Sequence, residues 1–221
     1  MVDHGSKGVN SKVYNLSLTW SWLPPMYCSW LYDRPAGWLA TDIQHFRWNG
    51  SSWALCRDSG WLYNRSQSAS NSWSWELGLA CGNGWHGTNG GVYVKKDGQW
   101  KGGWVWSGAE YVIYNTIAGT RSSATEPAPP PPAWINADGT TDATKLPEKV
   151  DVVGTDGMPT GVTVNLKELV TAPALDSGNT PTDPAGVVRK YSTTTDENGQ
   201  THGVEDVTLT DAYRGRIDPR P

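Results

Sequence analysis

The chain has 221 residues, a net charge of −4, and fourteen Trp against a single Phe. Neither half has the basic stripe of a nucleic-acid-binding protein: residues 1–120 hold nine Lys/Arg against seven Asp/Glu, and residues 121–221 hold nine against fifteen. No run of about 18 apolar residues is present, so the sequence predicts no membrane span.

Composition divides the chain at a Pro-rich segment. Thirteen Trp precede residue 107, and the last is Trp134. Residues 118–133 (AGTRSSATEPAPPPPA) are typical of a semi-rigid polyproline II linker. We therefore expect an N-terminal arm at 1–12, a Trp-rich β-domain at 13–117, the linker at 118–133, and an acidic, partly extended hairpin arm at 134–221.

The Trp-rich part reads as a series of hairpins. Alternation predicts a long first strand from Val13 to Trp22, ended by Pro24-Pro25 because Pro cannot donate to a ladder. Asn49-Gly50 in FRWNGSSW and Asp97-Gly98 in VYVKKDGQWKGGWVW each predict a type I′ turn, which needs φ > 0 at both central residues. Residues 80–91 (ACGNGWHGTNGG) read as a Gly-rich loop.

Seven to nine short strands with turns every 8–12 residues predict an all-β fold, a small antiparallel β-sandwich or barrel. Trp residues two positions apart face the same side of a strand. We expect three such pairs to form the core, since each Trp buries up to roughly 250 Å². They are Trp20/Trp22, Trp73/Trp75 and Trp104/Trp106.

The C-terminal region carries two further β-signals. Residues 150–165 predict a hairpin that turns near Asp156-Gly157, and residues 187–209 one that turns at Asn198-Gly199. Large apolar residues are too few here for an independent core. We therefore expect these hairpins to need a partner surface, supplied by other protein subunits through residues 134–221.

Three cysteines, Cys28, Cys56 and Cys81, fit either one disulfide with one free thiol or three thiols. In an oxidising compartment a Cys56–Cys81 disulfide is favoured, because both residues flank hairpin-like segments. The chain has no Cys-x-x-Cys, and only His45 and His86 lie well inside the Trp-rich part, so no metal site is expected.

Catalytic motifs are sparse. Glu76 and Glu110 stand on predicted strands beside Trp, as glycosidase acids do, but no carboxylate pair stands out. The sequence has no Gly-x-Ser-x-Gly elbow, phosphate loop or dinucleotide fingerprint. We expect no enzyme and no cofactor. A small toxin or hydrolase is the third interpretation, and it requires a deep pocket holding Glu76 or Glu110.

Four Trp are poorly explained by alternation and lie at loops or strand ends. An exposed indole stacks on the apolar face of a pyranose ring, while neighbouring amides hydrogen-bond the sugar hydroxyls. The alternative for each Trp is that it shields the end of the sandwich. The expected ligand-binding residues are Trp38, Trp61, Trp85, Trp100, Asn83 and Asn89.

Two segments, FRWNGSSW and GGVYVKKDGQWKGGWVWSG, together with the Cys-bearing strand after the first, resemble small Trp- and Gly-rich exported β-proteins of actinobacteria. The resemblance covers residues 13–117 and implies no particular activity. The first twelve residues have no apolar stretch typical of a signal peptide. That absence favours either a mature end with an added Met, or a phage particle protein from such a host.

Two functions are expected on these grounds. The first is a non-enzymatic surface module, extracellular or on a virion, whose aromatic loops bind a glycan or cell-wall polymer and whose C-terminal arm anchors it. The second is a phage virion structural protein, a decoration or tail component, whose Trp face and arm pack on neighbouring subunits.

Overall fold

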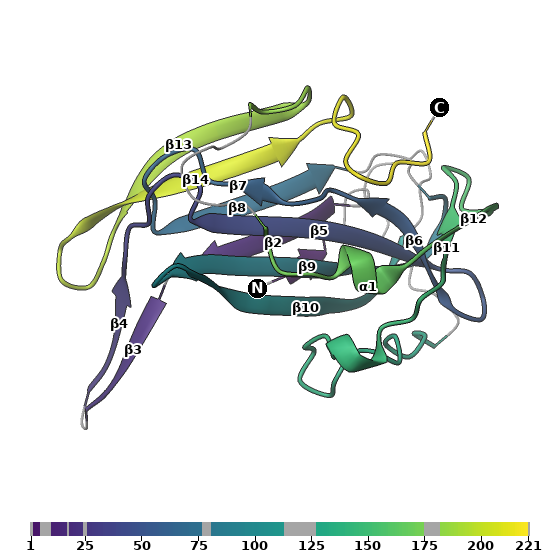
Figure 1. Cartoon of the computed structure of the whole chain (residues 1–221), viewed down its shortest axis with the longest axis horizontal. Helices are drawn as coiled ribbons and strands as arrows, with labels where there is room; N and C mark the ends of the chain where they lie inside the picture. Colours follow the sequence, from purple (N-terminus) through teal and green to yellow (C-terminus); the bar gives the residue numbers. More distant parts are fainter. Residues whose placement is uncertain are drawn as a thin grey trace.

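The computed structural model describes residues 2–4, 10–16, 18–23, 26–76, 81–112, 127–174 and 182–220. The fold is nearly all β, as the turn spacing predicts, and its strands form two large mixed sheets and a separate hairpin without closing into a barrel (Figure 1). Within the described residues, no helix is long and apolar enough to cross a bilayer. The side chains of residues 1–31 and of Glu76 lie outside the description, and with them the Trp20/Trp22 pair and the Cys28 thiol.

The larger sheet has the strand order β10-β9-β5-β6-β11-β12, with the short strand β7 paired to β5. Its long central strands are antiparallel, whereas β11 runs parallel to β6. The strands are β5 (Leu39–Trp48), β6 (Trp53–Asp58), β7 (Leu62–Tyr63), β9 (Gly84–Lys96), β10 (Gln99–Val112), β11 (Val150–Val153) and β12 (Pro159–Val164).

The β9–β10 hairpin turns at Asp97-Gly98, where both residues have positive φ (+52° and +74°), so the type I′ prediction is confirmed. The predicted Gly-rich loop at 80–91 is wrong from Gly84 on, because these residues form the first half of β9. Glycine has a packing role there. A Cβ at Gly91 would lie 2.7 Å from Cη2 of Trp61, so the missing side chain makes room for an indole.

The β5–β6 hairpin also departs from its prediction. Trp48 pairs with Trp53, so the connection has four residues rather than a two-residue type I′ turn. The Asn49 side chain holds this loop by accepting hydrogen bonds from the backbone N–H groups of Ser51 (3.0 Å) and Ser52 (2.8 Å). A short polar side chain such as that of Asn49 can accept hydrogen bonds from nearby backbone N–H groups, and this stabilises the four-residue loop in place of a two-residue type I′ turn.

The smaller sheet has the order β1-β2-β8-β14-β13. β14 runs parallel to β8 and antiparallel to β13, so a strand from the C-terminal region lies beside one from the Trp-rich part. The predicted first strand is interrupted: β2 joins this sheet, whereas β3 pairs with β4 in a separate hairpin (lower left in Figure 1). The strands are β1 (Val2–His4), β2 (Asn10–Leu16), β3 (Leu18–Leu23), β4 (Met26–Leu31), β8 (Ser70–Glu76), β13 (Val187–Thr195) and β14 (Thr201–Leu209).

Both C-terminal hairpins form where the turn signals place them, at β11–β12 and at β13–β14. The structure differs from the expected separate arm, because each hairpin extends a sheet begun by the Trp-rich part. The partner surface that these apolar-poor strands need is therefore this chain's own β6 and β8.

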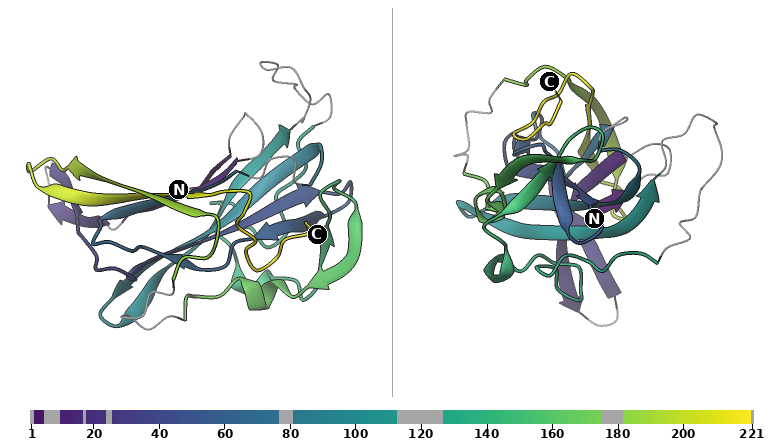
Figure 2. Two further views of the ribbon diagram at one scale, coloured as in Figure 1. Left: turned by 90° about the horizontal axis from the view of Figure 1, so that it is seen from above. Right: turned by 90° about the vertical axis from the view of Figure 1, so that its right-hand side faces the viewer.

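Two apolar layers hold the sheets. Figure 2 shows the segment 127–170, in green, beside the strands of the larger sheet. One layer lies between the sheets, where Ile43 and Cys56 of the larger sheet meet Trp73 and Trp75 of the smaller. The other covers the outer face of the larger sheet with the segment 127–170, which includes a 3₁₀ turn (Ala143–Lys145) and the one-turn helix α1 (Leu166–Leu169). Its largest members are Phe46, Trp53, Trp104, Trp106 and Trp134. The Trp73/Trp75 and Trp104/Trp106 pairs are thus core residues, as expected.

Candidate functional site

A pocket of about 310 Å³ opens where β7, the start of β13 and the C-terminal segment meet. This volume is at the lower end of the range of ligand-binding pockets. The walls combine aromatic, cationic and anionic side chains, the mixture that orients a polar ligand. They are Trp61, Leu62, Tyr63, Arg65, Thr182, Asp183, Pro184, Arg189 and Tyr213, and we call the site the Trp61 pocket.

The aromatic wall is rigid because it continues into the core. Trp61 packs edge-to-face on Tyr93 and on Trp104, with ring centroids 5.3 and 5.4 Å apart. Such pairs add about 0.5–1.5 kcal/mol beyond area burial. Tyr63 extends the row outward to Trp100, 6.0 Å away. The indole that borders the pocket is thus held in place before any ligand arrives.

The charged wall is a network between Arg65 and β13. Asp183 accepts hydrogen bonds from Nε and Nη2 of Arg189 (both 2.7 Å) and from Nη2 of Arg65 (3.2 Å). Beneath it, the fully buried Glu205 pairs with Nη1 of Arg189 and accepts from the backbone N–H of Arg65 (2.9 Å). Hydrogen bonds donated by Arg189 hold the pKa of Asp183 below its usual value.

The third wall comes from the C-terminal segment. Tyr213 donates its hydroxyl to the carbonyl of Ser59 at 2.7 Å and packs edge-to-face on Trp75. Three residues later, Arg216 reaches two fully buried carboxylates: Nη2 lies 2.7 Å from Asp42, and Nε lies 2.7 Å from Asp58. This ion cluster fixes the segment that carries Tyr213 into the pocket.

The cluster makes stability depend on pH in a defined direction. Burial raises the pKa of Asp42 well above the usual value of an aspartate, and the charge of Asp58 adds to the rise, although Arg216 and Ser59 oppose it. A carboxyl with a raised folded-state pKa stabilises most when protonated, and its contribution falls as pH rises from about 4 through the folded-state pKa. We therefore expect the free energy of unfolding of the wild type, minus that of Asp42→Asn, to fall between pH 4 and 7 in urea titrations.

Asp218 provides the control for that measurement. Burial acts to raise the pKa of Asp218, but hydrogen bonds from Arg220 and the charge of Arg57 outweigh it and lower the pKa. The wild-type minus Asp218→Asn difference should rise with pH only up to the unfolded-state pKa of about 4, so it should stay flat between pH 4 and 7. A difference for Asp42→Asn that also stayed flat would show that the pKa of the Asp42 carboxyl is not raised in solution.

The expected ligand-binding residues separate into groups. Trp61 lines the pocket, and Trp100 is joined to it through Tyr63. Trp38 borders the same end of the sheet, where its carbonyl accepts from the backbone N–H of Lys95 (2.8 Å). These three are half-buried, so their indoles are neither free rings nor core residues.

The other three expected residues lie elsewhere. Trp85 packs on Tyr111 at the opposite end of β9. Asn83 is exposed in the loop before β9, and its carbonyl accepts from Nη2 of Arg47 at 2.7 Å. Asn89 is fully buried, with its amide bonded to Gln44 (3.2 Å) and its carbonyl oxygen to Thr141 (3.0 Å). A ligand outside the sheet cannot reach Asn89, so this expectation does not fit the structure.

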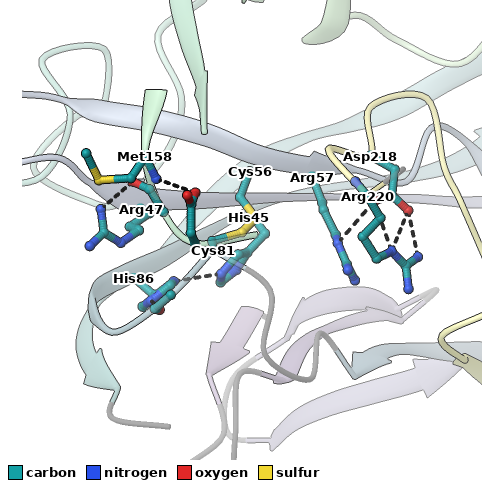
Figure 3. Close-up of a disulfide and its surroundings, with 12 residues drawn as sticks. His45, Arg47, Cys56, Arg57, Cys81, His86, Met158, Asp218 and Arg220 are labelled. Atoms are coloured by element: carbon teal, nitrogen blue, oxygen red, sulfur yellow. Dashed lines mark hydrogen bonds and ion pairs between the residues drawn. A yellow bond between two sulfur atoms is a disulfide. The ribbon is translucent and has the colours of Figure 1, made fainter. Parts of the chain in front are cut away.

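A second polar cluster surrounds the disulfide (Figure 3). Cys56 and Cys81 are joined, the pairing that the sequence favours, with Cα atoms 6.0 Å apart. Beside them the buried rings of His45 and His86 stack, and Nε2 of His45 lies 2.9 Å from Nδ1 of His86. Since the carbonyl of Gly82 can only accept, Nε2 of His86 carries a proton toward it (3.0 Å).

The candidate catalytic residue Glu110 does not lie at the pocket. Glu110 is half-buried on β10, opposite His86 in the ladder, and does not line the Trp61 pocket. Among the residues that the structure describes, no three His, Cys, Asp or Glu side chains lie close enough to hold a metal ion.

Sequence reasoning missed the polar wall of the pocket. Arg65 stands in the polar stretch NRSQSASN, and Asp183 in a Pro/Thr/Asp loop, where neither has a local signal. They are 118 residues apart and meet only because β14 lies beside β8. No protein-family model, curated protein or solved structure matches this chain.

Proposed function

We propose that the protein is a non-enzymatic binding module that takes a glycan or cell-wall polymer into the Trp61 pocket, at a site outside the cell or on a virion. The observation that carries the proposal is an open pocket in which a rigid indole and two tyrosines face a guanidinium–carboxylate network. A sugar ring presents an apolar C–H face and several hydroxyls, and each hydroxyl both donates and accepts. In the pocket, the indole of Trp61 suits the apolar C–H face, and the charged side chains of the opposite wall suit the hydroxyls.

The proposal predicts that Trp61→Ala weakens glycan binding by about tenfold or more, equivalent to about 1.4 kcal/mol. The full chain is titrated with chitin oligomers, cellulose oligomers and cell-wall polysaccharide by calorimetry and by Trp fluorescence. Near-ultraviolet circular dichroism checks that the variant keeps its tertiary packing, because Trp61 also contacts Trp104.

The matched control is Trp85→Ala. Trp85 is also half-buried and also packs edge-to-face on a tyrosine, with centroids 5.3 Å apart, but it lies at the other end of β9. We expect Trp85→Ala to bind as the wild type does. Equal losses in both variants would mean that the pocket is not the site. A folded wild type that binds no glycan would sink the proposal.

The second candidate is a virion structural component, and one feature favours it. The edge strand β13 leaves Val188 and Tyr191 more than half exposed, and an open edge with apolar side chains is suited to pairing with another chain. Failure of every glycan to bind, in a protein that forms stable oligomers, would favour this second function.

A further inference from the structure

We propose that Asp183 makes the Trp61 pocket selective for uncharged sugars over acidic ones. This inference rests on the proposed function and names the class of ligand. Two cations, Arg65 and Arg189, face two anions, Asp183 and Glu205, so the four groups carry no net charge. An acidic sugar brought among them would leave one negative charge without a partner in a partly desolvated site.

The guanidinium groups are also occupied by the chain's own carboxylates. Arg189 directs Nε and Nη2 at the two oxygens of Asp183 and Nη1 at Glu205, while its guanidinium lies 5.1 Å from the ring centroid of Trp73. Arg binds the carboxylate or phosphate of a ligand through the same pair of parallel hydrogen bonds that Arg189 makes to Asp183. Asp183 fills that position, so a ligand anion has to displace it.

A neutral hydroxyl needs no such displacement. The Asp183 side chain is 30% exposed and that of Arg65 is 22% exposed, whereas Arg189 and Glu205 are covered. Of these four charged groups, a ligand therefore reaches one anion, Asp183, and one cation, Arg65, which stays paired with it. A sugar hydroxyl can donate to Oδ2 of Asp183 while that oxygen keeps its bond from Nε of Arg189, because each carboxylate oxygen has about two acceptor positions.

The test compares oligosaccharides of equal length with and without carboxylates. Chitohexaose and cellohexaose are the neutral probes, and hexagalacturonate is the acidic probe, each titrated into the full chain at 150 mM salt. The wild type should bind its better neutral probe at least about tenfold more tightly than hexagalacturonate. Asp183→Asn, which frees one positive charge, should tighten hexagalacturonate binding by about tenfold and weaken neutral binding.

Asp151→Asn is the matched control, because it changes net charge equally at an exposed position on β11, away from the pocket. It should keep the wild-type preference. The wild-type comparison needs no variant, so it tests the selectivity itself even if Asp183→Asn fails to fold.

The outcomes separate the inference from the function on which it rests. Hexagalacturonate bound as tightly as the neutral probes, and lost in Trp61→Ala, would overturn the selectivity while leaving glycan binding in place. Identical binding by Asp183→Asn and Asp151→Asn would show that Asp183 is not the selecting residue. Binding of neither class would overturn both.

Discussion

Replacing Arg216 by Met lowers the free energy of unfolding by about 3 kcal/mol, because it leaves two buried carboxylates without their cation. Asp42 and Asp58 are fully buried, and both lie 2.7 Å from the Arg216 guanidinium. Breaking a fully buried ion pair typically costs about 3–5 kcal/mol. We expect the lower end of that range, since Arg216 is 34% exposed and water partly replaces it.

Arg214→Met is the matched control for this variant. Arg214 belongs to the same C-terminal segment, but its side chain is 57% exposed, and its distance to Asp218, 3.7 Å, is longer than the 2.7 Å contacts of Arg216. Because the Arg214 end of this pair lies in solvent and Asp218 keeps its bonds from Arg220, the loss should be about 0–1 kcal/mol. Urea unfolding at pH 7 measures both variants. Similar losses for Arg214→Met and Arg216→Met would contradict the assignment of the carboxylate pair to Arg216.

Replacing Cys56 and Cys81 together by Ala is expected to lower the free energy of unfolding by about 3–4 kcal/mol. The disulfide closes a loop of 25 residues, and a loop of this length restricts the unfolded chain by roughly that amount. Both cysteines are fully buried in the layer between the sheets, so the lost sulfurs also reduce core packing.

Reductant gives an independent measurement of the same bond. Dithiothreitol should shift the wild-type unfolding midpoint toward that of the double variant and leave the double variant unchanged. Cys28→Ala controls for the loss of a thiol and should remain sensitive to reductant. A wild type that unfolds identically with and without reductant would show that the two thiols are not joined in solution.

Local features were predictable from the sequence because neighbouring residues determine them. Asp97-Gly98 specifies its own turn, and the hairpin that turns at Asn198-Gly199 forms where expected. Trp61 drew notice because alternation does not explain it, and it lines the pocket. Asn89 was expected to bind a ligand because the sequence around it was interpreted as a loop. Glycines around it read as a loop, whereas they make room for indoles on a strand.

The polar half of the pocket was beyond sequence reasoning. Arg65, Asp183 and Arg189 come together through the parallel pairing of β14 with β8, and no short-range pattern specifies a parallel partner. The same pairing explains why the C-terminal hairpins are not a separate arm. Their few apolar residues suffice because Val207 and Leu209 share a core with Trp73 and Trp75.

That parallel pairing joins segments far apart in the sequence, which is expected to slow folding. Val207 lies opposite Trp73 in the ladder, so β8 finds its neighbour more than a hundred residues later in the sequence. Contacts of such long range close slowly, because the loop entropy is lost before the pairing compensates it. Until β14 arrives, one edge of β8, which carries Trp73 and Trp75, stays open. An unpaired strand edge of this kind is prone to pairing with another chain.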